Sequence, residues 1–493
     1  MKNIESMDVK IVGSSDYSKY PFSNPERTYN MMIYEDTLVP MWGYRKALEL
    51  LNYKIEGRGC FESTRGGFAI VVIGNIVYRI NSITGSVPEV LFTLGTDKGA
   101  VFIDENLSSQ ICIVGTPELW IYNYSTNTFG IPSAILANTD LVPNYVTYQN
   151  TQFIIGNAIQ APSGSQWFVY IAENPVTTGF ELDLIATLTL QTKPDYAVAA
   201  LRIPGKGNNL LVFGKTVTEI WNNIGGLLVY QKNSSINIDY GCVSVETIAA
   251  SDDYVVWLGI NEKSYPFIIV MKGGEANEIS TSGIDQQLQS VKFPEQSCAF
   301  FMRQNGHLLY QLTFYNPEDN FTLVYDFTTK AFFDSTDWNY NFHPARSVMQ
   351  FQGNSYFISL VRGNLYEINS NFTNYNVDHN QTYEIPRVRI TNTLRLDVPQ
   401  VCKYKYFTFW MENGTQANFP INPQENPRVD VSLSKNGGIT FGNAVPYYMH
   451  KTGNYNNQPV FRNLGIGTQL TIQMRFWGMD KFLVKNGKVA MSL

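Results

Sequence analysis

"FAIVVIGNIVYRIN", which runs from Phe68 to Asn81, is the stretch of sequence that decides the fold. Two apolar runs are separated by Gly-Asn and end in a polar residue, which is the pattern of a β-hairpin with a tight turn. Similar stretches follow along the chain: "CIVGTPELWIYN" from Cys112, "LLVFGKTVTEIWN" from Leu210 and "SYFISLVRGNLYEIN" from Ser355. A hairpin that recurs in this way indicates a fold built by repetition.

The recurrence is regular. The centre of the second strand of each hairpin marks one repeat, and the markers are Tyr78, Tyr122, Tyr170, Ile220, Ile268, Tyr325 and Tyr366. The steps between markers are 44, 48, 50, 48, 57 and 41 residues, and a period of about 40–50 residues that holds four short strands is typical of a β-propeller blade. We therefore predict an all-β fold with a β-propeller of about seven blades over residues 61–383. Six or eight blades stay open because the 57-residue step is long, and a large sandwich of unrelated hairpins is the alternative.

Glycine ends five of the seven first strands. A tight turn between two strands favours glycine, so we expect these glycines at the inter-strand turns. They are Gly74, Gly115, Gly156, Gly214 and Gly259.

The two ends of the chain differ from the repeats. We predict that residues 1–60 form an N-terminal extended segment that acts as an interface arm, with one short helix from Tyr44 to Leu51. Residues 384–493 contain longer alternating strands joined by Gly/Asn turns, such as "KYKYFTFWMENG" and "QLTIQMRFWGM". This pattern predicts a C-terminal antiparallel β-sandwich.

Composition limits the function classes. The chain is 44% hydrophobic and 14% aromatic but only 16% charged, which favours sheets and wide protein–protein contact. A net charge of −6 with a pI near 5.4 argues against a protein that coats nucleic acid, because that role needs a basic face; a narrow contact with DNA stays open.

The five cysteines are widely spaced and form no CxxC or Cys/His cluster, so we expect neither a disulfide framework nor a zinc site. A reducing compartment is the expected setting. The first 20 residues lack a signal-peptide core, and no apolar run approaches the roughly 20 residues of a membrane span.

No stretch has the pattern of a catalytic site, and we expect no enzyme activity, no cofactor and no metal. "GKTVTE" from Gly214 resembles the end of a phosphate-binding loop, but Asn209 stands where the first glycine belongs and the context is strand–turn–strand. The histidines are far apart in the sequence and are expected at the surface or in the core. They are His307, His343, His379 and His450.

"SKNGGITF", from Ser434 to Phe441, resembles the Asp-box of sialidases, S-x-D-x-G-x-T-W, with Asn436 in place of Asp and Phe441 in place of Trp. The motif is physically a hairpin. Ser and Asx side chains bond backbone amides of the turn, and Gly437 and Gly438 supply positive φ angles. It therefore predicts a β-hairpin and supports a glycosidase only faintly.

Three stretches, in this order, resemble one family. "ERTYNMMIYED", from Glu26 to Asp36, resembles an N-terminal E-R-x-x-N-M-Y-x-E segment and is followed by "LVPMWGY". "AVAALRIPGKGNNLLVFGKTVTEIWNNIGG" and the C-terminal "VSLSKNGGITFGNAVPYYM" with "FRNLGIGTQLTIQMRFW" complete the series. They are similar to the tail-hub proteins of short-tailed phages (podoviruses), also called packaged-DNA stabilisation or tail accessory proteins. The candidate structural and interface residues that match are Glu26, Arg27, Asn30, Met31, Trp42, Ser434, Asn436, Gly437, Gly438, Thr440 and Phe441.

The resemblance implies a virion structural protein, assembled in the host cytoplasm. It implies a homo-oligomeric ring of six copies below the portal and its adaptor ring, which helps retain packaged DNA, contacts genomic DNA in passing and carries fibres, spikes or a needle. Two other classes stay open. A propeller glycoside hydrolase with a carbohydrate-binding sandwich would need paired carboxylates about 5–9.5 Å apart at one propeller face, and a cytosolic propeller scaffold would be a monomer with one adhesive face.

Overall fold

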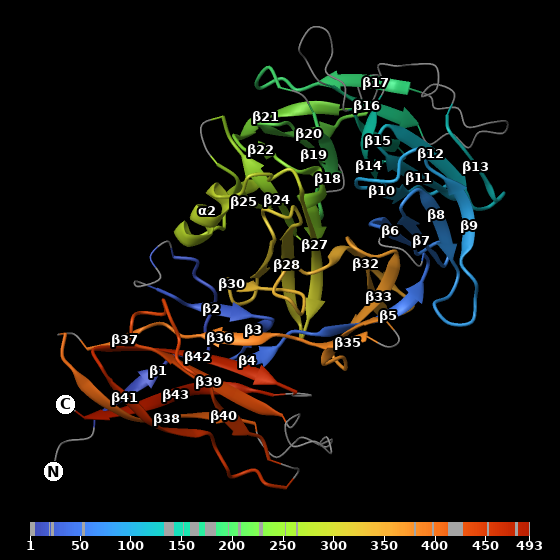
Figure 1. Ribbon diagram of the computed structural model, residues 1–493. Coiled ribbons are helices and arrows are strands. Elements are labelled where there is room, and N and C mark those ends of the chain that lie inside the picture. The colour runs from blue at the N-terminus through green and yellow to red at the C-terminus, as the bar shows by residue number, and fades with distance from the viewer. Residues whose placement is uncertain are drawn as a thin grey trace.

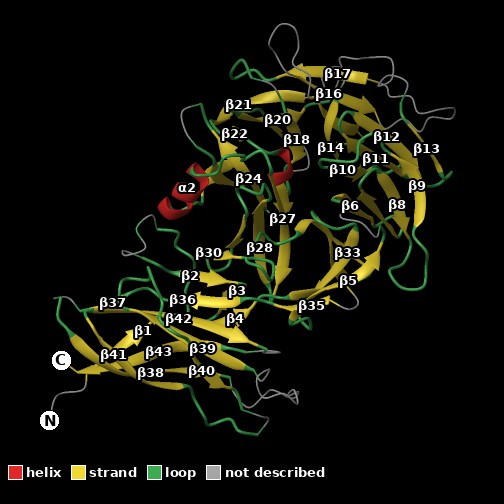
Figure 2. Cartoon of the chain, in the orientation of Figure 1, coloured by secondary structure: helices red, strands yellow, loops and turns green. Residues whose placement is uncertain are grey.

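A computed structural model describes residues 5–18, 20, 24–51, 55–132, 142–150, 152–157, 167–172, 184–195, 197–205, 209–225, 230–251, 253–262, 265–378, 381–396, 399–412, 427–450, 453–478 and 482–492. These residues are almost entirely β-structure. They form a ring of small sheets, with a second group of strands at one side of the ring (Figures 1 and 2).

The ring is a seven-bladed β-propeller, which confirms the prediction, and each blade is an antiparallel sheet whose strands follow one another in space. The first three blades are β6 (Gly57–Ser63), β7 (Phe68–Ile73), β8 (Ile76–Ile80), β9 (Glu89–Thr93); β10 (Phe102–Glu105), β11 (Gln110–Gly115), β12 (Glu118–Asn123), β13 (Thr128–Gly130); and β14 (Pro143–Gln149), β15 (Gln152–Asn157), β16 (Trp167–Ala172), β17 (Leu184–Thr189). The fourth and fifth are β18 (Ala199–Arg202), β19 (Asn209–Phe213), β20 (Thr218–Asn223), β21 (Tyr230–Ile238); and β22 (Gly241–Cys242) with β23 (Ala249–Ser251), β24 (Tyr254–Ile260), β25 (Phe267–Lys272), β26 (Glu275–Glu278). The sixth and seventh are β27 (Ser297–Gln304), β28 (His307–Phe314), β29 (Phe321–Asp326), β30 (Ala331–Asp334); and β31 (Ala345–Phe351), β32 (Asn354–Ser359), β33 (Asn364–Asn369), β5 (Gly43–Glu49).

Neighbouring blades share a buried apolar core all round the ring, and β7 shows how the sequence encodes it. Ile70 and Val72 pack toward the second blade, whereas Val71 and Ile73 pack toward the seventh. Successive side chains of a strand point to opposite faces, so a strand that is buried on both faces is apolar throughout. The run Phe68–Ile73 has no polar residue for this reason, and the same demand in every blade makes the hairpin pattern recur.

An insertion explains the 57-residue step between the markers of the fifth and sixth blades. Helix α2 (Ser282–Gln289) lies between the two markers, whereas the 3-10 turn η1 (Val245–Thr247) comes before the first of them. The hydroxyl of Thr281 caps α2 by accepting from the backbone N–H of Ile284, and Ile284 and Leu288 are buried against the fifth and sixth blades. The long step therefore adds a helix and no eighth blade.

The N-terminal part of the chain closes the last blade. β5 pairs antiparallel with β33, with Tyr44 opposite Ile368 and Arg45 opposite Glu367. The short helix expected over Tyr44–Leu51 is therefore wrong. The stretch contains good helix formers, but β33 offers it a row of backbone partners and Tyr44 a buried aromatic cluster, and such tertiary contacts override local propensity.

The expected role of the five glycines is correct only in part. Gly74 lies in the turn between β7 and β8 with a φ of 55°, as a tight turn requires. Gly156 and Gly259 lie inside strands instead, and a Cβ there would come within 2.3 Å of Asn144 Oδ1 and 2.6 Å of Ile269 Cγ1 respectively. At these two positions glycine is needed because of close packing between strands.

Two further sheets lie beside the sixth and seventh blades (Figure 1). The first contains β1 (Glu5–Val9), β3 (Met31–Tyr34), β4 (Thr37–Pro40), β38 (Cys402–Met411), β41 (Val460–Gly467) and β43 (Val484–Ser492). The second continues the sixth blade from β30 through β2 (Arg27–Tyr29), β36 (Arg387–Ile390), β42 (Gln469–Trp477), β39 (Arg428–Ser434) and β40 (Val445–Tyr448), with β37 (Leu394–Arg395) beside β42. Both sheets pack on one buried cluster that includes Leu38, Phe407, Ile472 and Met474. β34 (Asn374–Asp378) and β35 (Gln381–Glu384) extend the seventh blade beyond β5.

These sheets combine strands from the first 40 and the last 110 residues of the chain. The limits 1–60, 61–383 and 384–493 stay a prediction of how the chain divides.

Candidate functional site

The N-terminal motif lies at the junction between the propeller and the two neighbouring sheets. Asn30 joins β2 to β3 with a φ of 54°, a conformation that Asn adopts more readily than most residues. Its buried side-chain amide donates to the hydroxyl of Thr336 (2.9 Å) and to the carbonyl of Pro386 (3.0 Å), and its Oδ1 accepts from the backbone N–H of Thr336 (2.8 Å). Asn30 therefore ties the end of the sixth blade to the start of β36.

The two methionines after Asn30 point into different cores. Met31 is fully buried in the cluster shared by the two C-terminal sheets, while Met32 is fully buried in the cluster between the sixth and seventh blades. Because adjacent side chains of a strand point to opposite faces, β3 is a wall common to both cores.

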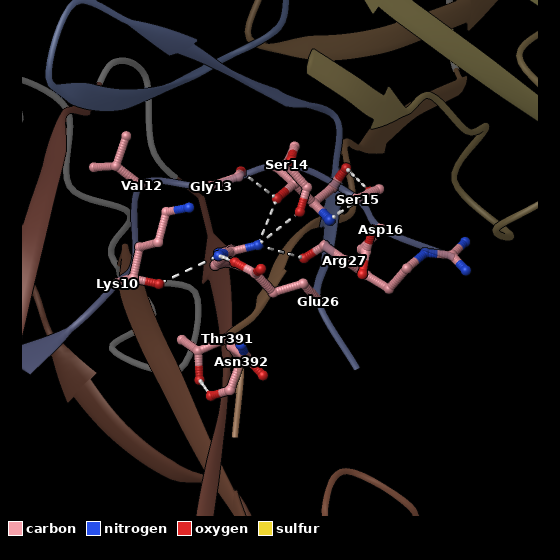
Figure 3. A network of polar contacts seen from close by, with 12 residues as sticks. Lys10, Val12, Gly13, Ser14, Ser15, Asp16, Glu26, Arg27, Thr391 and Asn392 are labelled. Atoms are coloured by element: carbon pink, nitrogen blue, oxygen red, sulfur yellow. Dashed lines mark hydrogen bonds and ion pairs between the residues drawn. The ribbon is translucent and has the colours of Figure 1, made fainter. Parts of the chain in front are cut away.

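Arg389 and Glu26 form a buried ion pair in the same junction. Figure 3 labels Glu26, Lys10 and Ser14 of this polar network. Arg389 also donates to the carbonyls of Ser14 (3.0 Å) and Lys10 (3.2 Å) and to the hydroxyl of Thr28 (3.0 Å). Burial lowers the pKa of Arg389, and the carboxylate of Glu26 opposes this shift. A charge this deep needs its partner, so the pair fixes the N-terminal segment against β36.

Arg27 binds the last strand of the sixth blade. Its Nε and Nη2 donate to the two carboxylate oxygens of Asp334 at 3.0 and 2.8 Å, and its guanidinium carbon lies 3.7 Å from the ring centroid of Tyr17. Burial acts against the charge of Arg27, but Asp334, together with Tyr17 and Tyr29, more than offsets it, and the pKa of Arg27 lies above its ordinary value. Ser15 also donates to Asp334, at 2.5 Å. The carboxylate of Asp334 therefore links β30 to the segment that contains Ser15 and to β2, which contains Arg27.

The C-terminal motif is the expected hairpin turn between β39 and β40. Ser434 Oγ accepts from the backbone N–H of Gly438 (2.9 Å), and Asn436 Oδ1 accepts from that of Thr440 (3.0 Å). Gly437 and Gly438 have φ angles of 71° and 85°. A Cβ on Gly438 would lie 2.7 Å from the Cβ of Pro25, so this turn contacts the residue directly before Glu26.

Trp42 lines a hollow on the outer side of the junction. Its indole N–H donates to Asn305 Oδ1 (3.3 Å) and its backbone N–H to Gln304 Oε1 (3.2 Å). The hollow has a volume of about 510 Å³ and is lined mainly by apolar side chains, including Met41, Phe372 and Phe482. Trp42 therefore attaches the N-terminal segment to the sixth blade and leaves part of its ring accessible.

The structure thus brings Glu26, Arg27, Asn30 and Met31 together and places the Ser434 turn next to them, while Thr440 is exposed and Phe441 half-buried at the outer end of that turn. Sequence reasoning missed the residues that complete the junction, namely Asp334, Thr336 and Arg389. The alternating "RVRI" of β36 was the available signal, because arginine at a strand position that should be buried indicates an internal ion pair.

The described parts of the chain contain no group of three or more His, Cys, Asp or Glu residues that could hold a metal ion. The phosphate-loop imitation at Gly214 is a strand–turn–strand element, and the carboxylate of Asp195 already accepts the backbone N–H of Thr216 (2.7 Å). His307 bonds Asp326 (2.8 Å), and His343 is buried, whereas His379 lies outside the described residues. None of the described helices is long and apolar enough to cross a membrane.

A closed seven-bladed propeller, with an N-terminal strand that closes the ring and a buried polar junction to two further sheets, places the chain in the class of all-β propeller proteins. The sequence matches the family described as "Bacteriophage P22 Gp10, beta-propeller" over residues 30–361. The chain therefore belongs to this family of phage structural proteins, which confirms the resemblance found in the sequence and indicates a protein of the virion.

No curated protein matches the sequence. Among solved structures, the chain is similar to the WD40 propeller domain of Doa1 (13% identity, 66% of this chain and 96% of that chain, TM-score 0.40). It is also similar to an extracellular domain of a putative one-component system from B. thetaiotaomicron (10%, 84% and 48%, TM-score 0.43) and to an ancestral GH74 enzyme (10%, 85% and 61%, TM-score 0.41). Likenesses this distant indicate nothing about function.

Proposed function

We propose that the protein is the hub of a short phage tail. Six copies form a ring below the portal and its adaptor ring, help to retain the packaged DNA, and carry fibres, spikes or a needle. Membership of the phage propeller family over residues 30–361 is the observation that carries this proposal. The position in the tail, the copy number and assembly in the host cytoplasm follow from the sequence resemblance.

The stiffness of the fold supports a role in transmitting mechanical force. A propeller with a core between every pair of neighbouring blades is stiff, and its blade edges are short. The junction around Asn30 and Arg389 joins this ring to the C-terminal sheets through buried hydrogen bonds. Such a body can transmit force between a portal and attached fibres without changing shape.

The contact with DNA is proposed to be brief. With a net charge of −6, the chain has no overall attraction for phosphate, and a weakly repulsive lumen would let DNA slide past. Retention would then come from a mechanical seal rather than from adhesion.

Contacts between copies are proposed to use residues 1–60 and 384–493 on at least one side, because the propeller satisfies its own blade edges. The buried motif residues Glu26, Asn30 and Met31 would act by holding this region in shape. Exposed aromatic residues such as Tyr34 and Tyr448 remain available for a neighbour.

Cryo-electron microscopy of the assembled particle tests the proposal. We expect a ring of this chain between the adaptor and the distal tail, and particles that lack the chain should lose their DNA after packaging. One copy per particle, or a position on the capsid surface, would contradict it. The hydrolase alternative predicts turnover on a glycan panel that stops when a single carboxylate is replaced, and we expect no turnover.

A further inference from the structure

Charge is distributed very unevenly along the chain. Residues 384–493 contain 13 Lys and Arg against 6 Asp and Glu, while residues 1–383 contain 23 against 36. The C-terminal part is therefore positive by 7 and the rest negative by 13, although the whole chain is only mildly acidic. A protein with this polarity attracts its own copies head to tail.

The positive part carries an apolar surface on β38 and β41, two strands that lie away from the propeller (Figure 1). In β38 the side chains of Phe407, Phe409 and Met411 are buried in the core, whereas Tyr406 and Trp410 point outward. Trp410 is 66% exposed. Trp410 lies near the end of β38, at an irregularity of its pairing with β43. An outward tryptophan on a sheet surface indicates a contact surface, because Trp, Tyr and Arg dominate the binding energy of interfaces.

Neighbouring strands complete this surface with basic and aliphatic side chains. Strand pairing puts Arg462 beside Tyr406, Ile466 beside Lys403, and Val460 and Lys488 on the two sides of Thr408. Ile466 is 63% exposed, and a hollow of about 770 Å³ lies next to Trp410, lined in part by Val460 and Lys488. We name this surface the outer β38 face; its members are Lys403, Tyr406, Trp410, Val460, Arg462 and Ile466.

An acidic counterpart lies at one end of the fifth blade. Glu262 and Tyr265 lie in the turn between β24 and β25, and Glu278 of β26 pairs opposite Ile269 at the same end of the sheet. Asp239 reaches this end as well, because Lys193 approaches both Asp239 (3.5 Å) and Glu262 (3.7 Å). The single positive charge of Lys193 offsets only part of the negative charge of Asp239, Glu262 and Glu278. Tyr265 is 54% exposed, so the acidic end also offers an aromatic side chain to a partner.

We propose that the outer β38 face binds the acidic end of the fifth blade of a second copy of this chain. Two different surfaces of one molecule then meet, which is the heterologous contact that a closed ring requires. Charge complementarity indicates that the partner is a second copy, because an acidic surface that fits the basic, aromatic face is present in the same chain. The inference rests on the proposed function, since it names the contact by which a hub ring would close.

The first test is a charge reversal with compensation, in the full-length chain. Sedimentation velocity at low salt should show self-association about tenfold weaker for Lys403→Glu/Arg462→Glu and for Trp410→Ala. Asp239→Lys/Glu262→Lys should weaken it equally, and the combination of both charge reversals should restore it. Lys98→Glu, a single charge reversal at an exposed position after the first blade, should leave it unchanged.

The second test locates the contact directly. Equal amounts of ¹⁴N- and ¹⁵N-labelled chain are treated with a carbodiimide, which joins a lysine amine to a carboxylate, and linked peptides are identified by mass spectrometry. We expect mixed-isotope links from Lys403 or Lys488 to Asp239, Glu262 or Glu278. A wild-type chain that stays monomeric without such links, charge reversals that behave like Lys98→Glu, or a combination that fails to recover would each overturn the proposal.

A duplex DNA oligonucleotide provides the competing occupant. Binding that depends on Lys403 and Arg462, with self-association unchanged, would assign the outer β38 face to nucleic acid and overturn the proposal. A ring seen in the particle with other contacts would also overturn it but leave the proposed function intact. Self-association through the outer β38 face, in a chain that is absent from the tail, would support this contact and contradict the proposed function.

Discussion

His343 is buried in the connection between the sixth and seventh blades, and its environment requires a neutral imidazole. Its Nδ1 accepts from the side-chain amide of Gln311 (3.1 Å) and from the backbone N–H of Ala345 (3.3 Å). Burial lowers the pKa of His343 to about 3. Between pH 6.5 and 3 the unfolded chain therefore binds a proton at this position that the folded chain rejects.

The free energy of unfolding should fall as the pH drops through this window, by up to about 5 kcal/mol from His343 alone. The variant His343→Asn keeps an acceptor near the position of Nδ1 and does not titrate. Urea unfolding at several pH values should give a shallower decline for the variant than for the wild type. Parallel curves would show that His343 does not resist protonation in the folded state.

The Glu26–Arg389 pair predicts an effect on stability at neutral pH. Glu26→Gln removes the negative charge and leaves Arg389 buried without compensation, so the variant should lose about 3–5 kcal/mol of stability. The double variant Glu26→Gln/Arg389→Met should be less destabilised than the sum of the single variants, because the second change removes the stranded charge. Denaturant unfolding measures both effects, and Lys292→Met, in an exposed pair with Glu318, is the control for which little change is expected. Additive losses would contradict the coupling.

The sequence predicted only one side of this junction. Resemblance pointed to Glu26, Arg27 and Asn30, whereas their partners Arg389, Asp334 and Thr336 lie about 300 residues or more away along the chain. No local pattern encodes a hydrogen bond over such a separation. The Ser434 turn, in contrast, could be predicted in detail, because its hydrogen bonds join residues at most four positions apart.

At the scale of elements, the hairpins of the blades could be predicted from local sequence, whereas the strand that closes the ring, β5, could not. Each hairpin is a local structure whose two strands and turn are adjacent in sequence, so its pattern could be recognised locally. All seven markers lie in the third strand of their blades. β5 has no hairpin partner of its own. Its strand conformation depends on β33, more than 300 residues away, and the local sequence around Lys46 and Ala47 favours a helix.

A disulfide across the closure should stabilise the ring. Arg45 and Glu367 are opposite each other in the β5–β33 pair, at a spacing suited to a disulfide, and their present ion pair at 3.5 Å is exposed on the arginine side. Arg45→Cys/Glu367→Cys should raise stability by up to about 5 kcal/mol when oxidised, because the bond encloses almost the whole propeller. Thermal unfolding with and without reductant measures the gain. An equal melting temperature in both conditions, with the bond verified by mass spectrometry, would mean that opening of the seventh blade does not limit stability.

At the scale of the whole molecule, the sheet order argues that the two ends of the chain fold together. β2 lies between β30 and β36, β4 pairs with β43 at Leu38–Val484, and β1 pairs with β43 from Glu5 to Val9. The strand patterns after residue 384 correctly indicated β-structure. They did not indicate these additional strands, because each N-terminal strand is too short to show a period of its own.

This arrangement predicts that residues 384–493 do not fold alone. In the isolated fragment β36 would lack its partner β2, and β43 would lack β1 and β4. The core would also lose the side chains of Met31 and Leu38, which the N-terminal segment supplies. We expect a poorly dispersed NMR spectrum and rapid proteolysis for residues 384–493, and a gain in protection when residues 1–42 are added as a separate peptide. The variant peptide with Asn30→Ala and Met31→Ala is the matched control and should protect less, because it lacks the amide that binds Pro386 and the side chain that fills the core. A fragment 384–493 with native-like dispersion and no response to the peptide would show that the C-terminal sheets are an autonomous domain.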